Sequence, residues 1–600
     1  MASGSFFFVV GPSGAGKDSL MDGARQQLAP EQFIFAKRTI TRPANSGGEA
    51  HQACTEAEFV LLEQQGKFLI AWQAHHLSYG LPSTLLDALA AGQHVIANGS
   101  RAMVAQLSAR VPNLVVVEIG APFEILAQRL SQRGRESATD VAKRLARKTE
   151  PYPEGTHVLR VTNDQTPAIG MSRFLAALYT QLGQAPAHLA SLYKKIAGFA
   201  LTEGEYRPLL AAIHQRKYSG AELEAFLIAC TQHLSDDELI AVARCRSELM
   251  SRISWGRDMV VDKHSLGGTP GSRVTMIVIP IVAAHGLVIP KTSSRAITSA
   301  AGTADAMEVL AKVDLTLEQL KQCVAQTNAC IAWNGKLNHS VIDDVMNALT
   351  RPLALDTRRW SVASILSKKY SAGATHVVID IPYSEGGKVK TKSEADTLAQ
   401  TFETVGVALG LVVKAFATDG QAPIGRGIGP ALEARDVLQV LEGHPDAPAD
   451  LLEKSLFFAS QILALDPAVG SVARGRARAL ELLNSGAASA AMQAIIASQG
   501  AQPPLTWAGV LKHEVRAQRS GRVQSIDGFV ISGLGRCAGA PADQRAGVDL
   551  ACGLGATVKT GDLLYVLQAS NQEKLAQAVA LAQSDSGYRF SYDESAETTC

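Results

Sequence analysis

Hydrophobic and polar positions alternate in blocks over the first part of the chain. Amphipathic helical patterns, such as Leu126–Leu130 and Val141–Arg147, lie between short apolar runs. The apolar runs are Phe6–Val10, Phe68–Ala71, His94–Ala97 and Leu114–Ile119. Short buried strands that alternate with helices are typical of a parallel sheet covered by helices. The pattern therefore predicts an α/β domain over residues 1–183.

The pattern changes after residue 183. Gln184–His188 reads QAPAH, a short stretch of small residues with a proline, and is typical of a linker. A helical pattern, Leu189–Ser254, follows, and a second alternation of apolar runs and helices begins at Met259. Its apolar runs are Met276–Val282, His376–Ile381 and Leu409–Ala417; the first fits a buried strand or a buried helix. From Thr506 onward, short strands and glycine turns accompany one predicted helix, Glu573–Gln583.

Composition narrows the class of protein. The 600 residues suffice for several domains, and 46% hydrophobic with 19% charged residues is ordinary for a globular chain. A net charge of +1 gives no basic excess for a nucleic-acid polymer. The eight cysteines form no C-x-x-C pair, which disfavours zinc and disulfides and favours a cytoplasmic protein. The N-terminus lacks the basic region of a signal peptide, and no apolar run reaches the roughly 20 residues of a membrane span.

A glycine-rich loop follows the first predicted strand directly. It reads GPSGAGK and precedes a helical pattern, Ser19–Leu28, which is the strand–loop–helix context of a P-loop. A chance glycine-rich turn is the alternative, but the flanking elements disfavour it. Backbone amides and the helix N-terminus would bind the phosphates of ATP. The predicted ATP-binding residues are Gly11, Pro12, Ser13, Gly14, Ala15, Gly16, Lys17, Asp18 and Ser19, with Lys17 catalytic.

The residue after the P-loop lysine departs from the usual pattern. Asp18 stands where a Ser or Thr normally holds Mg²⁺, and Ser19 follows it. Because Mg²⁺ favours oxygen ligands, Asp18 could hold the metal directly or through water. We therefore expect ATP with Mg²⁺ as phosphoryl donor, with Asp18 and Ser19 as candidate metal ligands.

Arginines mark a second, phosphorylated substrate. Arg38, Arg42, Glu49 and Tyr79 are candidates for binding an acceptor, since arginine clamps phosphate bidentately. A further group crowds one segment: Arg129, Arg133, Arg135, Arg144 and Arg147. This group could be a solvated helix face or a mobile lid over the transferred phosphoryl group. We favour the lid and take Arg133 and Arg135 as catalytic candidates.

Residues 4–182 resemble the guanylate kinase fold and, more closely, its relative ribose 1,5-bisphosphate phosphokinase. The matching motifs are GPSGAGKDSL, TRPANSGGEAH, WQAHHLSYGLP, ANGSRA and RLSQRGRE. Guanylate kinases are acidic after the third strand, whereas this chain reads Asn98-Gly99-Ser100-Arg101, which disfavours GMP. The resemblance implies transfer from ATP to ribose 1,5-bisphosphate, giving phosphoribosyl diphosphate.

A second loop with phosphate-binding chemistry begins at Asp262. The run DKHSLGG combines Lys263, a hydroxyl and two glycines, and Thr275 opens the next apolar run. The segment Lys291–Thr303 follows, and between Thr292 and Ser299 it places five hydroxyl residues around Arg295. A polar surface loop with helix caps is the alternative. An oxyanion or ribose-phosphate site explains the composition better.

Residues 190–600 resemble the thymidine/pyrimidine-nucleoside phosphorylases, most closely the type that includes AMP phosphorylase. The long run from Val261 to Asp305 carries this, with WNGKLN, PLALD, SILSKK and GRGIGPALE. The resemblance implies inorganic phosphate as co-substrate, a helical domain beside an α/β domain, and a homodimer. Catalytic roles would fall to Lys263 and Asp356, the latter as proton donor. Phosphate and nucleotide would meet Lys263, His264, Ser265, Gly268, Thr275, Ser294, Arg295, Ala296, Ile297, Thr298, Ser299, Thr303, Ser364, Lys368 and Lys388.

Phosphorolysis leaves the base with negative charge unless an acid protonates it. Asp356 follows the apolar run PLAL, so burial could raise its pKa; a helix N-cap is an equal alternative. Pyrimidine-specific relatives carry an Arg before this Asp, whereas Leu355 stands here, which disfavours thymine. AMP would yield ribose 1,5-bisphosphate, the substrate implied for the kinase.

The predicted organisation is a P-loop kinase domain with a parallel sheet (1–183), a linker (184–188), a helical domain (189–256, joined in space by about 340–370), an α/β domain (257–505) and an α+β segment (506–600). We predict a bifunctional enzyme acting on small molecules. The alternatives are a thymidine phosphorylase with a degenerate, regulatory or dimerising kinase domain, and a purely structural protein.

Overall fold

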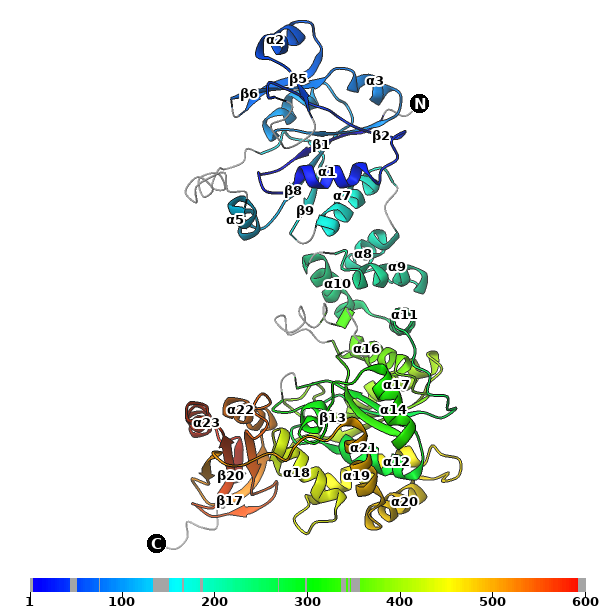
Figure 1. The fold of residues 1–600 in the computed structure, drawn as a ribbon, viewed down its shortest axis with the longest axis vertical. Coiled ribbons are helices and arrows are strands. Elements are labelled where there is room, and N and C mark those ends of the chain that lie inside the picture. The colour runs from blue at the N-terminus through cyan, green and yellow to red at the C-terminus, as the bar shows by residue number, and fades with distance from the viewer. Residues whose placement is uncertain are drawn as a thin grey trace. The chain divides into compact units, whose positions relative to one another are not determined.

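The computed structural model describes residues 4–43, 51–74, 76–132, 151–164, 167–183, 187–218, 220–267, 269–296, 299–335, 342–343, 346 and 357–591. The chain forms two compact units, the first ending at Cys230 and the second beginning at Thr231. Both units combine parallel sheets with helices, so the predicted α/β class is confirmed. Figure 1 labels the elements within each unit.

The first unit contains a five-stranded parallel sheet in the order β2-β7-β1-β8-β9. Its strands are β1 (Phe6–Val10), β2 (Phe33–Phe35), β7 (His94–Asn98), β8 (Leu114–Gly120) and β9 (Val158–Thr162). Because side chains alternate along a strand, Phe7 and Val9 pack into one core, which includes Leu20 of α1 (Lys17–Arg25). Phe6 and Phe8 pack into the core on the other face. The fully apolar β1 is thus explained by helices on both faces of the sheet.

A second sheet of the first unit has the order β4-β3-β6-β5. Its strands are β3 (Thr39–Ile40), β4 (Gln52–Ala53), β5 (Phe68–Ala74) and β6 (Leu77–Pro82). The other helices are α2 (Glu56–Gln64), α3 (Leu85–Ala90), α4 (Val104–Ser108), α5 (Phe123–Gln132), α7 (Pro167–Gln181), α8 (Ala187–Ile196), α9 (Glu203–His214) and α10 (Gly220–His233), of which α10 runs past Cys230. Helix α7 packs on α1 and β9. The helices α8 and α9 pack against each other.

The second unit contains parallel strands in the order β10-β13-β14, and the separate parallel pair β11-β12. The strands are β10 (Val261–Ser265), β11 (Ile289–Ser293), β12 (Ala329–Trp333), β13 (His376–Tyr383) and β14 (Val412–Asp419). A parallel bridge between Val260 and Val288 joins the two groups. Because the strands are parallel, their carboxyl ends form one edge, where Ser265 stands opposite Asp380.

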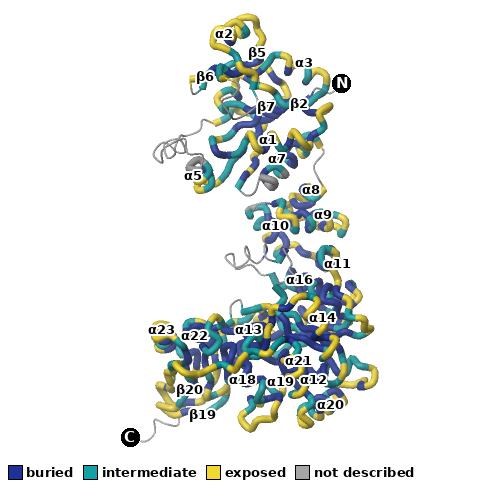
Figure 2. Tube along the Cα trace, viewed as in Figure 1, coloured by how far each residue is buried: buried dark blue, intermediate teal, exposed yellow. Residues whose placement is uncertain are grey.

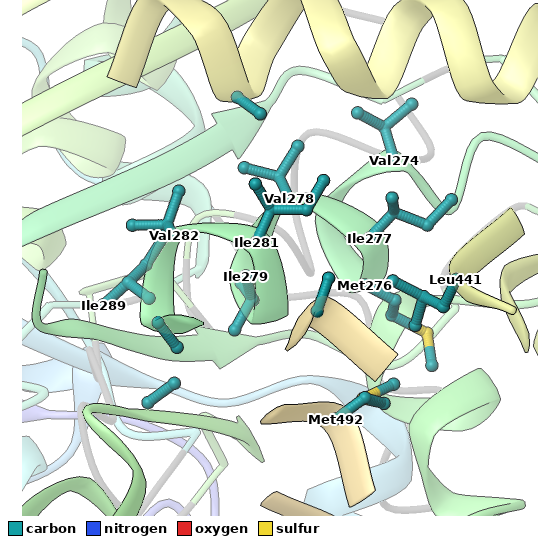
Figure 3. Close-up of a cluster of buried hydrophobic side chains, with 14 of the residues drawn as sticks. Val274, Met276, Ile277, Val278, Ile279, Ile281, Val282, Ile289, Leu441 and Met492 are labelled. Atoms are coloured by element: carbon teal, nitrogen blue, oxygen red, sulfur yellow. The ribbon is translucent and has the colours of Figure 1, made fainter. Parts of the chain in front are cut away.

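Helices cover this sheet: α11 (Asp236–Glu248), α12 (Val274–His285), α13 (Thr303–Glu308), α14 (Leu317–Thr327), α16 (Arg358–Ser371), α17 (Lys392–Ala408), α18 (Pro430–Leu441), α19 (Ala449–Leu463), α20 (Val472–Asn484) and α21 (Ala487–Gln499). The apolar run Met276–Val282 lies in α12, where every residue from Val274 to Ala283 is buried. A helix that is buried on all sides lacks an amphipathic period. For this reason the sequence pattern alone could not decide whether this run is a strand or a helix. Figure 3 shows its side chains in the main core, and Figure 2 shows the burial of these elements against the exposed outer surface.

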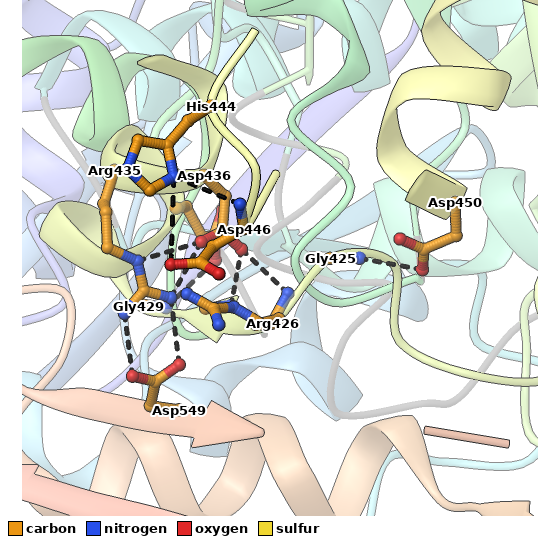
Figure 4. Close-up of polar contacts among 11 residues, drawn as sticks. Gly425, Arg426, Gly429, Arg435, Asp436, His444, Asp446, Asp450 and Asp549 are labelled. Carbon is orange, nitrogen blue, oxygen red and sulfur yellow. Dashed lines mark hydrogen bonds and ion pairs between the residues drawn. The ribbon is translucent and has the colours of Figure 1, made fainter. Parts of the chain in front are cut away.

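The end of the chain forms two antiparallel sheets, β15-β18-β20-β16 and β19-β17-β21. Their elements are β15 (Gly427–Ile428), β16 (Leu511–Arg516), β17 (Gly521–Ile526), α22 (Gly528–Ala538), β18 (Gly547–Leu550), β19 (Thr557–Val558), β20 (Leu563–Ala569), α23 (Gln572–Ser584) and β21 (Tyr588–Ser591). Arg435 of α18 pairs with Asp549 of β18 at 2.7 Å and with Asp436 at 2.7 Å (Figure 4). Asp436 also accepts hydrogen bonds from the backbone amides of Arg426 and Gly427. These bonds fix the GRGIGPALE segment against the terminal sheet.

Two helical glycines make opposite predictions for stability. A Cβ on Gly475 of α20 would lie 2.4 Å from the carbonyl oxygen of Ser460 in α19, whereas Gly533 of α22 has nothing within 4 Å. Gly475→Ala should therefore destabilise by about 1–3 kcal/mol through overpacking. Gly533→Ala should stabilise by roughly 0.5–1 kcal/mol, because alanine loses less backbone entropy. Denaturant unfolding midpoints compare the two variants; stabilisation by both would show that α19 and α20 are not packed this closely.

Candidate active sites

The P-loop lies between β1 and α1, as the sequence predicts. Gly11, Gly14 and Gly16 have φ angles of 149°, 86° and 83°, which non-glycine residues rarely adopt. A Cβ on Gly11 would meet the carbonyl oxygen of Ile119 at 2.2 Å. The Lys17 ammonium donates hydrogen bonds to the carbonyl oxygens of Gly11 (2.7 Å) and Pro12 (3.1 Å). The Lys17 side chain thus folds back over the P-loop and contacts its first two carbonyl oxygens.

Asp18 meets a polar side chain from the neighbouring strand. The amide nitrogen of Asn98, at the end of β7, donates to Oδ1 of Asp18 at 2.6 Å. Asn98 is buried, so its amide holds the carboxylate in a defined orientation. Asp18 and Ser19 supply the hard oxygen donors that Mg²⁺ favours, and the residues fit that ion.

A second asparagine, Asn163, contacts the P-loop from the end of strand β9. Asn163, directly after β9, is buried and donates from Nδ2 to the carbonyl oxygen of Ala15 at 2.8 Å. The backbone carbonyl oxygen of Asn163 accepts a hydrogen bond from Nη1 of Arg129 at 2.9 Å. Arg129, which the sequence grouped with the lid arginines, thus supports the P-loop. No local sequence pattern marks Asn163, because its partner lies 148 positions away.

Two of the predicted acceptor residues come together. Strand pairing places Ile40 opposite Tyr79, and the Arg38 guanidinium lies 5.2 Å from the centre of the Tyr79 ring. Arg42 contacts Nδ1 of His51 at 3.3 Å. Glu49, Arg133, Arg135, Arg144 and Arg147 lie outside the described residues. Their roles stay predictions.

In the second unit, predicted phosphate residues meet at a buried carboxylate. Asp380, at 0% exposure, accepts from the hydroxyls of Ser265 (3.0 Å) and Thr418 (2.6 Å). Its Oδ2 lies 3.6 Å from the ammonium of Lys263. Asp380 belongs to the apolar run His376–Ile381, and a lone acid in such a run is the signal that could have identified it. Lys263 and Ser265, two of the three predicted residues of β10, are therefore held by an acid that was not predicted from the sequence.

Burial shapes the protonation of this cluster. Burial lowers the pKa of Lys263 to about 8; Asp380 opposes this shift, while the charges of Lys454 and Arg273 add to it. Burial would raise the pKa of Asp380, but Lys263 and Lys454 together hold it below its usual value. Burial, with the charges of nearby lysines, also lowers the pKa of His264 well below its ordinary value. His264 is therefore neutral, and Asp380 is ionised, at neutral pH.

A third group of predicted residues surrounds the start of α12. Thr275 is buried in its first turn, and Arg273, two residues earlier, donates to Oγ1 of Thr303 at 3.2 Å. Arg273 also pairs with the buried Glu433 at 2.5 Å. Burial raises the pKa of Glu433 to about 7, and Arg273 opposes that shift. Neither Arg273 nor Glu433 was among the residues predicted from sequence.

The hydroxyl-rich loop after β11 is fastened by acids of α13. Asp305 accepts from the backbone amides of Ala296 (2.6 Å) and Gly302 (2.8 Å), and Ser299 donates to the carbonyl oxygen of Ala301. Arg295 forms a bidentate pair with Glu308 and lies over the Trp333 ring. Ser294 lies in the same loop and is exposed. Arg295 thus fastens the loop to α13.

Ser364 and Lys368 of α16 converge on Asp343. Oδ1 of Asp343 accepts from the Ser364 hydroxyl at 2.8 Å, and Lys368 lies 3.0 Å from Oδ2. The fully buried Arg246 of α11 pairs with the same carboxylate at 2.7 Å. Burial would raise the pKa of Asp343, but Arg246 and Lys368 outweigh it and hold the pKa well below its usual range. The sequence found two members of this group and missed the acid that joins them.

Lys388 lies beside the Lys263 loop. Its ammonium donates to the carbonyl oxygen of Leu266 at 3.2 Å, and burial lowers its pKa. The predicted proton donor Asp356, with Gly268, Ile297 and Thr298, lies outside the described residues. Among the residues that the structure describes, no three His, Cys, Asp or Glu side chains could together hold a metal ion. In the same part of the chain, no helix has the length and apolar character needed to cross a membrane.

The comparisons with known proteins assign the chain to a family. Residues 257–489 match the family described as "Glycosyl transferase family, a/b domain". The protein is therefore a transferase. A "Bifunctional ribose 1,5-bisphosphokinase-thymidine phosphorylase" of Cupriavidus pinatubonensis is 54% identical, with 96% of this chain and 97% of the relative covered. One of the same description from Azorhizobium caulinodans is 50% identical, with 99% and 98% covered. The chain belongs to the family of bifunctional ribose 1,5-bisphosphokinase-thymidine phosphorylases, which confirms both resemblances.

Removing the Asp343 charge should destabilise the second unit. In Asp343→Asn, Arg246 loses its anionic partner, and an uncompensated buried charge costs roughly 3–5 kcal/mol. Lys392→Met is the control, because its pair with Asp396 is exposed, and solvent screening leaves such a pair little effect on stability. Unfolding of the two variants is compared by circular dichroism in denaturant; equal midpoints would contradict the importance of the buried pair.

Proposed function

We propose that the protein catalyses two reactions that share an intermediate. The second unit cleaves a nucleoside monophosphate, AMP being favoured, with inorganic phosphate, and releases the base and ribose 1,5-bisphosphate. The first unit then transfers the γ-phosphoryl group of ATP to ribose 1,5-bisphosphate, which gives phosphoribosyl diphosphate and ADP. The observation that carries this proposal is one chain holding a P-loop with Lys17 and, in its second unit, the buried Lys263 paired with Asp380.

In the kinase reaction, an oxygen of the 1-phosphate attacks the γ-phosphorus, and the bond to the β-phosphate oxygen breaks. Backbone amides of residues Gly11 to Ser19 bind the ATP phosphates, and Lys17 stabilises charge on the transferred group. Arg38, Arg42, Glu49 and Tyr79 bind the acceptor, and the arginines at 133 and 135 cover the site. The juxtaposition of Arg38 and Tyr79 supports this assignment.

Mg²⁺ would be held by Asp18, directly or through water, and Ser19. When bound, it neutralises charge on the β- and γ-phosphates. Asn98 orients the Asp18 carboxylate through their 2.6 Å hydrogen bond.

In the phosphorolysis reaction, a phosphate oxygen forms a bond to C1 of the ribose as the C1–N bond to the base breaks. Asp356 donates the proton that the leaving base requires. Lys263, Ser265 and Thr275 form the phosphate side of the site, and Gly268, Ser294 to Ser299 and Thr303 form the ribose side. His264 belongs to the same phosphate and nucleotide site. Ser364, Lys368 and Lys388 contact the nucleotide. A small-molecule enzyme of this kind is expected to be a cytoplasmic homodimer.

A 5′-phosphorylated substrate fits the fusion better than thymidine does. Thymidine would give deoxyribose 1-phosphate, which lacks the 5-phosphate that the proposed kinase reaction retains. Thymidine is the second candidate, because the relatives are described as thymidine phosphorylases.

The reactions can be measured in sequence on the full chain. We expect phosphate-dependent release of adenine from AMP, with kcat/KM at least tenfold above that for thymidine, and phosphoribosyl diphosphate only after ATP is added. Chromatography of base and sugar products follows both steps. Preference for thymidine would refute the shared intermediate.

Lys17→Ala separates the two activities. The variant should lose at least 100-fold in ATP-dependent formation of phosphoribosyl diphosphate, because Lys17 contacts the transferred group. Release of base should stay within twofold of the wild type. If wild type and variant both lack kinase turnover on supplied ribose 1,5-bisphosphate, the P-loop domain is degenerate and serves regulation or dimerisation.

Asp18→Ala tests the metal assignment. We expect a roughly 10–100-fold weaker affinity for Mg²⁺ in the presence of ATP, the range found when metal-site residues are lost. Isothermal titration of Mg²⁺ into the protein with ATP measures it independently of turnover. Asp22→Ala is the matched control, since Asp22 lies on α1 but pairs with the exposed Arg25. Equal affinities in both variants would assign the metal elsewhere.

A further inference from the structure

Two cations at the second site have no role in the reaction described above. The first is Lys454 of α19, whose side chain is 12% exposed. Its ammonium lies 3.1 Å from the Thr418 hydroxyl and 3.7 Å from Oδ1 of Asp380. Lys263 lies 3.6 Å from the other oxygen of that carboxylate. Two ammonium groups from different elements therefore flank one acid.

The second cation is Arg273, which immediately precedes α12. It is 8% exposed and reaches two groups at once. Its Nε pairs with Glu433 at 2.5 Å, and Nη1 donates to Thr303 Oγ1 at 3.2 Å. Thr275, a predicted phosphate residue, lies in the first turn of the same helix. Arg273 therefore contacts Thr303, which is assigned to the ribose side, and precedes Thr275, which is assigned to phosphate, by two residues.

Both cations share the surroundings of Lys263. The charges of Lys454 and Arg273 each act on the Lys263 ammonium, which places the three cations in one electrostatic neighbourhood. Two carboxylates, Asp380 and Glu433, oppose them. Lys263 with Asp380 alone would carry no net charge and would attract a phosphate dianion poorly. The three cations outnumber these two partner acids by one positive charge, which can compensate part of the charge of a buried anion.

We propose that Lys454 and Arg273 are two further ligands of the inorganic phosphate that attacks the substrate. Asp380 orients Lys454 and Lys263 toward one side of the anion, and Glu433 holds Arg273 at the other. The guanidinium supplies the fork geometry that matches phosphate and that the two lysines lack. This assignment rests on the proposed phosphorolysis and specifies which side chains bind its nucleophile.

A purely structural role is the competing explanation. Lys454 would then only fasten α19 to β14, and Arg273 would only fasten α12 to α18. The two explanations differ in what they predict for phosphate. A structural residue lowers stability and all kinetic parameters together, whereas a phosphate ligand changes the KM for phosphate and leaves the KM for the nucleoside substrate nearly unchanged.

The test uses the full chain and inorganic phosphate as the probe. Lys454→Met and Arg273→Met should each raise the KM for phosphate roughly tenfold to 100-fold, the range for losing a charge-assisted hydrogen bond. The KM for the nucleoside substrate should stay within threefold. Phosphate alone should raise the melting temperature of the wild type and raise that of either variant less. Lys454→Arg keeps the charge and should retain most of the phosphate affinity, even if a methionine variant does not fold. Arg273→Lys keeps the charge but loses the fork, and should retain only part of that affinity.

Arg435→Met is the matched control, because Arg435 is also an arginine held by two carboxylates, Asp436 and Asp549. These contacts join α18 to strand β18 of the C-terminal sheet. Its KM for phosphate should equal that of the wild type. An unchanged phosphate KM in both folded methionine variants, or the same loss in Arg435→Met, would overturn the proposal. If the wild type cleaves no nucleoside but phosphate stabilises it more than the variants, the phosphate site stands and the proposed reaction fails.

Discussion

The buried carboxylate of Asp380 is the group on which the second active site depends. An ionised acid at 0% exposure is costly unless cations and hydrogen-bond donors surround it. Those partners come from three other elements: Lys263 and Ser265 from β10, Thr418 from β14, and Lys454 from α19. Satisfying one charge therefore draws two strand ends and a helix to a single point. Without Asp380, the two ammonium groups would repel each other and lose their orientation.

The first active site is organised differently. Backbone geometry forms the P-loop. Two neutral amides support it: Asn98 at the end of β7 contacts Asp18, and Asn163 after β9 contacts the carbonyl oxygen of Ala15. In many P-loop enzymes a loop Ser or Thr and a strand Asp hold the metal. Here the carboxylate belongs to the loop, at Asp18, and the strand carries the neutral Asn98. The neutral Asn98 orients the Asp18 carboxylate without adding charge, so an acid after the lysine is compatible with the proposed metal site.

Site residues that lie within one short segment were predicted from the sequence, whereas site residues that only the fold brings together were missed. The P-loop from Gly11 to Ser19 and the β10 residues Lys263 and Ser265 were identified because each lies within one short segment. Asp343 and Lys454 were missed because their partners lie far along the chain, 97 positions away in the case of Arg246 and Asp343. Arg295 was predicted to bind substrate, yet the structure pairs it with Glu308, a contact that no motif encodes. Helix α12 could not be told from a strand because complete burial removes the periodicity that separates them.

The same chemistry gives a reason to join the two reactions in one chain. Phosphorolysis keeps the activated C1 position of the sugar as a phosphate ester, whereas hydrolysis would release it as a free sugar. In the proposed pathway, a single phosphoryl transfer from ATP then completes the diphosphate at C1. This advantage exists only if the sugar leaving the second site already carries its 5-phosphate, because neither reaction adds one. The substrate preference of the second site therefore decides whether the two halves form a pathway or only share a chain. Recognition of the 5′-phosphate by the second site is thus the property on which coupling of the two reactions depends.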